Sequence, residues 1–253
     1  MRVLKLCLTY SCPFKCYFCY NKNKANDTTI LSLKMVDNFL HNNYDKFDKV
    51  VISGGEPTLL VRTYLLSLIE IIKKYTKNIE LETYPIIDTK LFNEMKDVQL
   101  RVSYDITARN RANEVWRRLL TIDRDFNLVV TLSPIVFRLH PNKILQTLNQ
   151  LPKLKTVIFK PFYNNQSYTY NIKNEDYKKF VNILNNSKLN LRYTYSYGDF
   201  NDEFILNPYG KLFCVQFDND VRIEKEISED DINDLKTNHP KSVIVWLISW
   251  DHF

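Results

Sequence analysis

The chain has 253 residues, of which 45% are hydrophobic and 25% are charged, and its formal net charge is +6. This length suits one large domain, or one domain with a modest appendage, that buries a sizeable core. The excess of 35 basic over 29 acidic residues is mild and evenly spread. It therefore favours an anionic cofactor, a nucleotide or an acidic peptide over nucleic-acid binding. No uninterrupted apolar run of about 18 residues occurs, and the first residues do not resemble a signal peptide. We expect a soluble, cytoplasmic protein without membrane contact.

Apolar periodicity predicts strands and helices that alternate along most of the chain. Alternation of this kind is typical of parallel β/α units, so we expect an α/β fold with six of them. The predicted strands are residues 2–9, 49–53, 79–84, 98–105, 128–133 and 156–159, and the predicted helices are residues 32–41, 59–75, 89–95, 111–124, 141–151 and 175–186.

The sequence changes character after about residue 190. Residues 191–197, 203–206 and 211–217 alternate like strands, and Asn207-Pro208-Tyr209-Gly210 supplies a turn between the last two. We therefore divide the chain into residues 1–190 and a small β-rich extension, residues 191–253, that we expect to cover the first domain.

Three of the five cysteines lie within eight residues, in Cys12-Pro13-Phe14-Lys15-Cys16-Tyr17-Phe18-Cys19. An odd cysteine count clustered in this way favours metal ligation in a reducing compartment over a disulfide framework. Thiolates are the ligands that both iron–sulfur clusters and zinc prefer. A closed zinc site needs four ligands, and no second Cys or His pair at zinc spacing occurs. The spacing thus favours an iron–sulfur cluster, with zinc and a chance grouping of cysteines as the alternatives.

The cysteine segment resembles the C-x3-C-x2-C motif of the radical S-adenosylmethionine (SAM) superfamily, in which an aromatic residue such as Phe18 commonly precedes the third cysteine. A second resemblance lies at the end of the second predicted strand, where residues 54–57 read Gly-Gly-Glu-Pro. The resemblance implies a partial (β/α)6 TIM-like barrel with a [4Fe–4S] cluster and SAM at one rim. It assigns the cluster to Cys12, Cys16 and Cys19, which leave one iron open to chelate SAM.

The same resemblance assigns SAM contacts to six residues. In the family the Gly-Gly-Glu-Pro turn binds the amino group of SAM, the aromatic residue packs near adenine, and polar residues at the end of the fourth strand contact the ribose. The corresponding residues of this chain are Phe18, Gly54, Gly55, Glu56, Ser103 and Asp105.

The segment from Phe204 to Cys214 resembles the opening hairpin of the SPASM or twitch extensions of radical SAM enzymes, in which a cysteine beyond the hairpin binds an auxiliary cluster. The remaining cysteines do not complete such a site, because Cys7 belongs to the first predicted strand. We therefore expect one cluster in the protein, and a Cys214 side chain that is buried as a small hydrophobic group.

The resemblance implies an enzyme that cleaves SAM reductively to a 5′-deoxyadenosyl radical, abstracts hydrogen from a substrate, and receives its electrons from a donor such as flavodoxin or ferredoxin. A peptide or protein side chain is one candidate substrate, and a small metabolite or nucleotide is the other. A non-catalytic, cluster-bearing regulatory or binding protein is the alternative of a different class. The sequence does not identify the substrate, the residue that catalyses the later steps, the fate of SAM or the oligomeric state.

Overall fold

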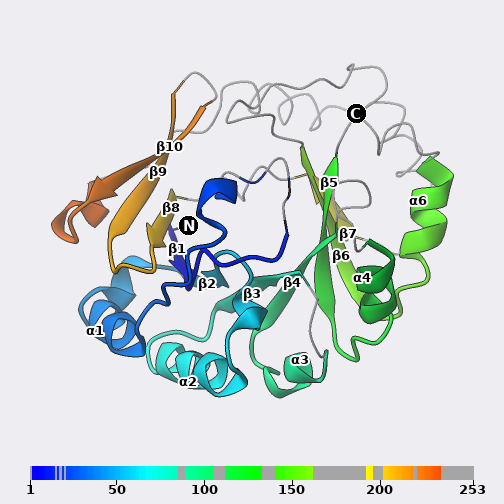
Figure 1. The fold of residues 1–253 in the computed structure, drawn as a ribbon, viewed down its shortest axis with the longest axis horizontal. Helices are drawn as coiled ribbons and strands as arrows, with labels where there is room; N and C mark the ends of the chain where they lie inside the picture. Colours follow the sequence, from blue (N-terminus) through cyan, green and yellow to red (C-terminus); the bar gives the residue numbers. More distant parts are fainter. Residues whose placement is uncertain are drawn as a thin grey trace.

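Ten strands form a single curved sheet in this computed structural model, in the order β10-β9-β8-β1-β2-β3-β4-β5-β6-β7 (Figure 1). The structure describes residues 2–14, 16, 19, 21–84, 89–104, 112–132, 141–161, 192–195, 202–218 and 221–234. Within these residues the two edge strands, β7 and β10, do not pair with each other, so the sheet is an open, partial barrel.

The central strands pair in parallel, and helices connect them. This pattern confirms the predicted α/β barrel architecture, and each of the six predicted strands matches an observed one. The strands are β1 (Arg2–Cys7), β2 (Lys49–Ser53), β3 (Ile79–Thr83), β4 (Gln99–Tyr104), β5 (Phe126–Leu132) and β6 (Leu154–Pro161). The helices are α1 (Leu33–Asn43), α2 (Arg62–Lys73), α3 (Lys90–Glu94), α4 (Ala112–Leu119) and α6 (Pro141–Leu148), and short 3-10 helices are η1 (Lys22–Lys24), η2 (Tyr44–Lys46), η3 (Pro57–Leu59) and η4 (Asp230–Asn233).

The strands after residue 190 lengthen the sheet at both ends. β7 (Arg192–Tyr195) pairs in parallel with β6, whereas β8 (Asp202–Leu206) pairs in parallel with β1. β9 (Leu212–Asp218) and β10 (Val221–Ile227) then continue outward from β8 in antiparallel fashion. The part of the C-terminal segment that forms β8 is thus hydrogen-bonded directly to the first barrel strand.

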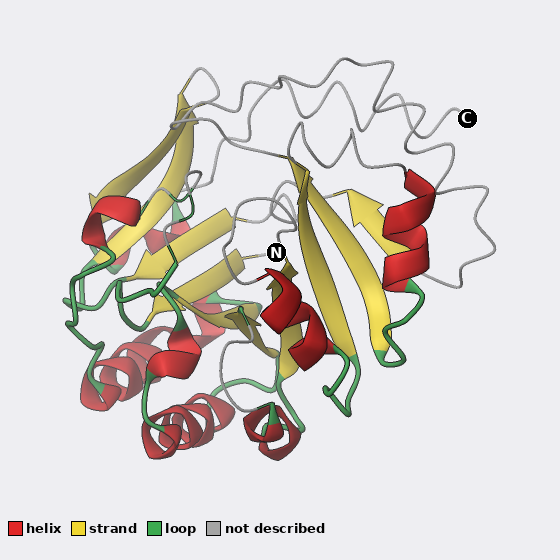
Figure 2. Cartoon of the chain, turned by 45° about the vertical axis from the view of Figure 1, so that its right-hand side comes forward, coloured by secondary structure: helices red, strands yellow, loops and turns green. Residues whose placement is uncertain are grey.

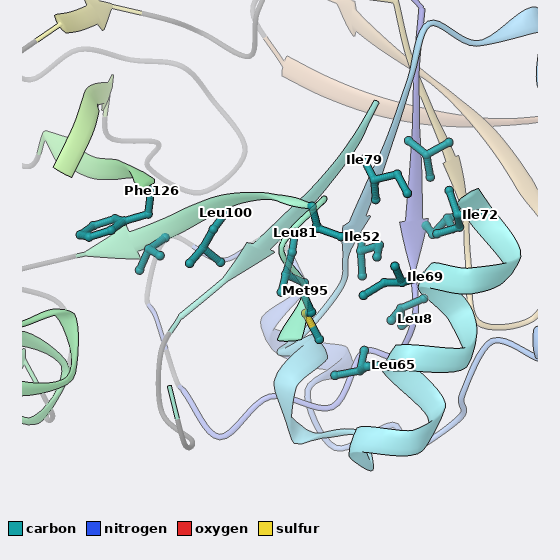
Figure 3. Packing of buried hydrophobic residues seen from close by; sticks show 14 of the residues in the cluster. Leu8, Ile52, Leu65, Ile69, Ile72, Ile79, Leu81, Met95, Leu100 and Phe126 are labelled. Carbon is teal, nitrogen blue, oxygen red and sulfur yellow. The ribbon is translucent and has the colours of Figure 1, made fainter. Parts of the chain in front are cut away.

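The main apolar core lies between the sheet and the helices on its outer side, as Figures 1 and 2 show. Side chains alternate between the faces of a strand, so Leu4 and Leu6 of β1 point toward this core while Lys5 points to the inner face. Figure 3 shows residues of α2 packed against those of neighbouring strands. The labelled members of this core are Leu8, Ile52, Leu65, Ile69, Ile72, Ile79, Leu81, Met95, Leu100 and Phe126.

Two features of the C-terminal segment differ from the sequence prediction. The strand predicted at residues 191–197 as part of the extension is β7, a seventh parallel strand of the barrel sheet, because its backbone pairs with β6. The strand β10 was not predicted. Three consecutive residues of it, Glu224, Lys225 and Glu226, are charged, and such charges are typical of an edge strand.

Several predictions concern parts of the chain that lie outside the described residues, namely the helix at 175–186 and the end of the extension from residue 235 onward. The division at residue 190 and the covering role of the extension stay predictions. Cys214 is fully buried in the main core, as predicted. Among the described residues, none of the helices has the length and apolar character required to cross a membrane.

Candidate cluster and cofactor site

The cysteine segment begins where β1 ends, at the carboxyl end of the parallel strands. The backbone after β1 continues to pair with the backbone after β2: Leu8 N–H donates to Ser53 O at 3.0 Å, and Gly55 N–H donates to Thr9 O at 2.6 Å. Glu56 N–H donates to Ser11 O at 3.0 Å. The Gly-Gly-Glu-Pro turn therefore lies directly beside the residues that lead into the cysteine motif, and the two sequence motifs meet in space.

Gly54 and Gly55 are required by this close backbone contact. A Cβ atom at Gly55 would lie 2.1 Å from Ser11 O, and one at Gly54 would lie 2.5 Å from Thr9 O. Gly54 also has a φ of +135°, which residues with side chains rarely adopt. The two glycines thus permit the close approach of the neighbouring segment of the same chain, residues 8–11.

Glu56 is buried, with 2% of its surface exposed, and its carboxylate joins the ends of β2 and β3. Its Oε1 accepts hydrogen bonds from Thr58 N–H at 3.0 Å, from the Thr58 hydroxyl at 2.5 Å and from the Thr83 hydroxyl at 2.6 Å. Its Oε2 accepts one from Tyr84 N–H at 2.8 Å. Burial raises the pKa of Glu56, and these donors oppose that shift because they stabilise the ionised form.

Phe14 ties the cysteine motif to β3. Its ring packs edge-on against the ring of Tyr84, with centroids 4.4 Å apart. Tyr84 is the residue whose N–H binds Glu56, so this contact couples the motif to the Glu56 network. Sequence reasoning missed both aromatic residues, although Phe14 lies within the motif, because an aromatic residue in a loop does not reveal its partner.

The three cysteines of the motif differ in burial. Cys16 is buried, whereas Cys12 and Cys19 are partly exposed. Cys19 N–H donates to Cys16 O at 3.1 Å, and Cys12 follows Ser11, whose carbonyl binds Glu56 N–H. Burial is the main cause that raises the pKa of Cys12 to about 11; a backbone hydrogen bond at Phe14 opposes the shift, and negative charge on Glu56, Cys16 and Cys19 adds to it. Bound metal would instead favour the thiolate forms.

The donor set of this loop fits an iron–sulfur cluster. Three thiols on one loop leave a cubane cluster with one iron that the protein does not ligate. Among the described residues, which include these three cysteines, no three His, Cys, Asp or Glu side chains are close enough together to hold one metal ion. Thiol chemistry and spacing alone therefore make Cys12, Cys16 and Cys19 the residues that would hold a [4Fe–4S] cluster.

Two hydrogen bonds fold the outer side of the loop back onto the cysteines. Lys22 N–H donates to Cys19 O, and Cys12 N–H donates to Ala25 O, both at 3.2 Å. The ammonium of Lys24 lies 4.7 Å from the centre of the Tyr10 ring, in a cation–π contact. The segment after Cys19 is thus held against the segment before Cys12.

The predicted SAM contacts are only partly described. Ser103 lies on β4 in the same alternation as Arg101, on the inner face of the sheet, and is partly exposed. Phe18 and Asp105 lie outside the described residues. The structure therefore brings Gly54, Gly55 and Glu56 together with the cysteine loop, and it places Ser103 on the inner face of the barrel.

A ladder of alternating charges crosses the inner face of the sheet below this site. Lys5 lies 3.1 Å from Glu203 and 3.6 Å from Glu82, which in turn lies 3.4 Å from Arg101. Glu80 lies between Arg101, at 2.9 Å, and Lys49, at 2.7 Å. Ser53 donates a hydrogen bond to Glu82 at 3.0 Å. Sequence reasoning missed this ladder because its members come from five strands.

The family model described as the Radical SAM superfamily matches residues 6–158, more than half of the chain. The chain belongs to the radical SAM superfamily. Membership implies an enzyme that uses an iron–sulfur cluster and SAM, and the matched residues include the cysteine loop, the Gly-Gly-Glu-Pro turn and most of the parallel sheet. A comparison with curated proteins gave no match.

Solved structures share the fold at low sequence identity. Streptococcus suis SuiB bound to S-adenosylmethionine has a TM-score of 0.63 at 13% identity, over 83% of this chain and 59% of SuiB. The enzyme anSMEcpe with bound AdoMet and Cp18Cys peptide has a TM-score of 0.61 at 18% identity, over 83% of this chain and 73% of that chain. SuiB has also been solved with its precursor peptide SuiA, and there the TM-score is 0.61 at 14% identity, over 83% of this chain and 58% of SuiB. This chain thus spans less than two thirds of the length of SuiB.

Proposed function

We propose that this protein is a radical SAM enzyme with one [4Fe–4S] cluster, held by Cys12, Cys16 and Cys19, and that it modifies a peptide or protein side chain. The observation that carries the proposal is the hydrogen bonding of the Gly-Gly-Glu-Pro turn to Thr9 and Ser11, which lead into the cysteine motif at the carboxyl ends of β1 and β2. The chemistry supplied by the bound cluster is one-electron cleavage of SAM to methionine and a 5′-deoxyadenosyl radical, which abstracts hydrogen from the substrate.

In this proposal the protein's own residues bind and orient SAM. Glu56 Oε2 accepts a single hydrogen bond among the described residues, from Tyr84, so it retains capacity for a donor such as the SAM amino group. The Oε1 bonds to Thr58 and Thr83 fix the carboxylate in place before SAM binds. Ser103 on the inner face is the proposed ribose contact, and Phe18 and Asp105 remain the predicted contacts to adenine and ribose.

The peptide substrate is supported by the two structural relatives that were solved with peptides, SuiB with SuiA and anSMEcpe with Cp18Cys peptide. Their identities of 14% and 18% support a shared fold, and the transfer of substrate class to this chain is our inference. A small metabolite or nucleotide is the competing substrate, and activity screening against both classes separates them.

The cluster assignment is tested by anaerobic reconstitution followed by iron and sulfide analysis. We expect about four irons and four sulfides per chain, since one three-thiolate site binds one cluster. Replacing Cys12, Cys16 or Cys19 by Ala should abolish the cluster. Cys214→Ala is the matched control, because Cys214 is buried in the apolar core and should not affect iron content. About eight irons, or cluster loss in the control, would contradict a single cluster.

The activity is tested by incubating the dithionite-reduced protein with SAM and measuring 5′-deoxyadenosine. A cluster-bearing regulatory protein would produce none, and methylthioadenosine in its place would show that a different bond of SAM is cleaved. Addition of a cognate peptide should raise 5′-deoxyadenosine formation and yield a modified peptide by mass spectrometry.

The role of Glu56 is tested by comparing Glu56→Gln with Thr83→Val. Both changes disturb the same buried network, but only the first removes the charge that would pair with the SAM ammonium. We expect Glu56→Gln to weaken SAM binding about tenfold or more, which corresponds to about 1.4 kcal/mol. Thr83→Val should weaken it much less at a similar loss of thermal stability. Equal losses of SAM affinity in the two variants would show that Glu56 has only a structural role.

A further inference from the structure

The turn between β8 and β9, residues 207–211, has a conformation that its own hydrogen bonds fix. Asn207 is buried, and its side-chain oxygen accepts from Tyr209 N–H at 3.0 Å and from Lys211 N–H at 2.9 Å. Gly210 N–H donates to Asn207 O at 2.9 Å, and the φ of Gly210 is +75°, a region that favours glycine. Figure 1 shows the β8–β9 pair beside β1, from which the cysteine loop leaves. The turn thus holds Tyr209 in a fixed position.

Tyr209 binds the part of the cysteine loop that follows Cys19. Its hydroxyl donates to Asp27 Oδ2 at 2.5 Å, although the two residues are 182 positions apart in the sequence. Asp27 is itself held in place, because its Oδ1 accepts from Thr29 N–H at 3.0 Å and its N–H donates to Lys24 O at 2.8 Å. The hydrogen bond from Tyr209 is the main cause that lowers the pKa of Asp27, so the accepting group stays a carboxylate.

The same turn also contacts the part of the loop that precedes Cys12. Tyr10 is buried, and it belongs to a small apolar cluster with Ile205 of β8. Burial is the main cause that raises the pKa of Tyr10 to about 12, and a hydrogen bond with the Asn207 side chain opposes that shift. The ammonium of Lys24 lies 4.7 Å from the centre of the Tyr10 ring. The turn therefore binds the chain on both sides of the three cysteines.

Backbone hydrogen bonds connect the two ends of the loop with the proposed cluster ligands. Cys12 N–H donates to Ala25 O, and Lys22 N–H donates to Cys19 O, both at 3.2 Å. A cluster bound by three cysteines closes the chain between them into loops. Such closure costs less conformational entropy when the ends of the segment are already held together. The β8–β9 turn therefore supplies order that the cluster would otherwise have to impose.

We propose that the β8–β9 turn positions the cysteine loop for cluster binding, and that Tyr209 is a positioning residue that acts through Asp27. This proposal rests on the proposed function, because it assumes a cluster at Cys12, Cys16 and Cys19. With the turn bound, the loop samples fewer conformations, so it opens less often and releases the cluster more slowly. The C-terminal segment is then part of the cluster site, although none of the proposed ligands lies in it.

The test compares Tyr209→Phe with Tyr75→Phe in the full chain. Each change removes one tyrosine hydroxyl that donates to an aspartate, since Tyr75 donates to Asp37 Oδ1 at 2.8 Å. Tyr75→Phe is the matched control, because this bond joins the chain after α2 to α1 and does not involve the cysteine loop. Three quantities are measured: the anaerobic rate at which reconstituted holoenzyme loses its visible cluster absorbance to EDTA, backbone amide exchange of the metal-free chain by mass spectrometry, and the free energy of unfolding of the metal-free chain in urea.

We expect Tyr209→Phe to lose its cluster about fivefold faster than the parent, because one net hydrogen bond changes an equilibrium by about that factor. Amide exchange should rise by a similar factor in peptides that cover residues 10–14 and 22–31, since the ends of the loop open more often. Tyr75→Phe should match the parent in both measurements, even where its loss of stability in urea equals that of Tyr209→Phe.

A double-variant cycle with Asp27→Ala isolates the hydrogen bond. Asp27→Ala should also speed cluster loss, and adding Tyr209→Phe should cause no further change, because the bond is already absent. Independent effects of the two changes would contradict the role of this bond. Equal rates of cluster loss in Tyr209→Phe and the parent, or an equal acceleration in Tyr75→Phe, would overturn the positioning role. A parent chain that binds no cluster would instead contradict the proposed function, and this inference with it.

Discussion

Where the charge ladder crosses β8 and β1 to β4, the two faces of the sheet differ in chemistry, although their residues alternate along the same strands. On the outer face, Leu4, Leu6 and Ile52 are fully buried against the helices. On the inner face, Lys5, Glu82 and their neighbours form a ladder of ion pairs. Buried residues occur on both faces, so burial alone does not decide whether a position is apolar or charged. The outer face needs apolar surface to hold helices, whereas the inner face bounds the space in which the barrel places its cofactor site.

Burial is graded along the charge ladder. The side chains of Glu80, Lys49 and Arg101 are 1%, 9% and 10% exposed, whereas those of Lys5, Glu82 and Glu203 are 22%, 17% and 16% exposed. Buried ion pairs contribute little net stability because desolvation opposes their attraction, but the loss of one partner is costly. The ladder therefore orients strands and keeps the inner face polar, and it is sensitive to single substitutions.

Among the substitutions that compare the two faces, Glu80→Ala should cause the largest loss in the free energy of unfolding. This change leaves Lys49 and Arg101 buried without their shared carboxylate, and we expect a loss of about 3–5 kcal/mol in the free energy of unfolding, measured by urea denaturation. Glu226→Ala is the matched control, because its pair with Lys211 is about half exposed and should contribute at most about 1 kcal/mol. Similar losses in both variants would show that the inner face behaves like ordinary surface.

A smaller effect is expected on the outer face for Ile52→Val. This change removes one methyl group from a fully buried position between the sheet and α2, and such deletions cost about 0.5–1.5 kcal/mol. Urea denaturation in parallel with the Glu80 variant gives the comparison. A loss larger than that of Glu80→Ala would mean that apolar packing limits stability more than the buried charges do.

The smallest effect is expected at Cys7, on the inner face. We expect no alkylation of its thiol in the native protein. Its thiol packs with Tyr10, Ile205 and Val215, and burial raises its pKa to about 12. At pH 8 this pKa leaves a thiolate fraction of about one in ten thousand, and the thiolate is the reactive form. Iodoacetamide should leave Cys7 unmodified in the native protein and alkylate it in urea, as located by tandem mass spectrometry. Fast native alkylation would show that the reagent reaches Cys7 on the inner face of the folded protein.

The cysteine motif and the six parallel strands of the barrel could be predicted from the sequence, because each depends on residues that are close together along the chain. The spacing of Cys12, Cys16 and Cys19 identifies a three-thiol loop, and apolar periodicity identifies β1 to β6. The position of Gly54, Gly55 and Glu56 after the second strand also follows, since parallel strands bring their carboxyl ends to one edge.

Only the tertiary structure decided which partners these residues have. Gly55 packs against Ser11, Glu56 binds Thr83 and Tyr84, and β8 pairs with β1 across almost 200 residues of sequence. Strand pairing and hydrogen bonding depend on backbone groups that every residue carries, so sequence pattern alone does not specify the partner. For the same reason the charge ladder, whose members come from distant segments, became visible only in the folded chain.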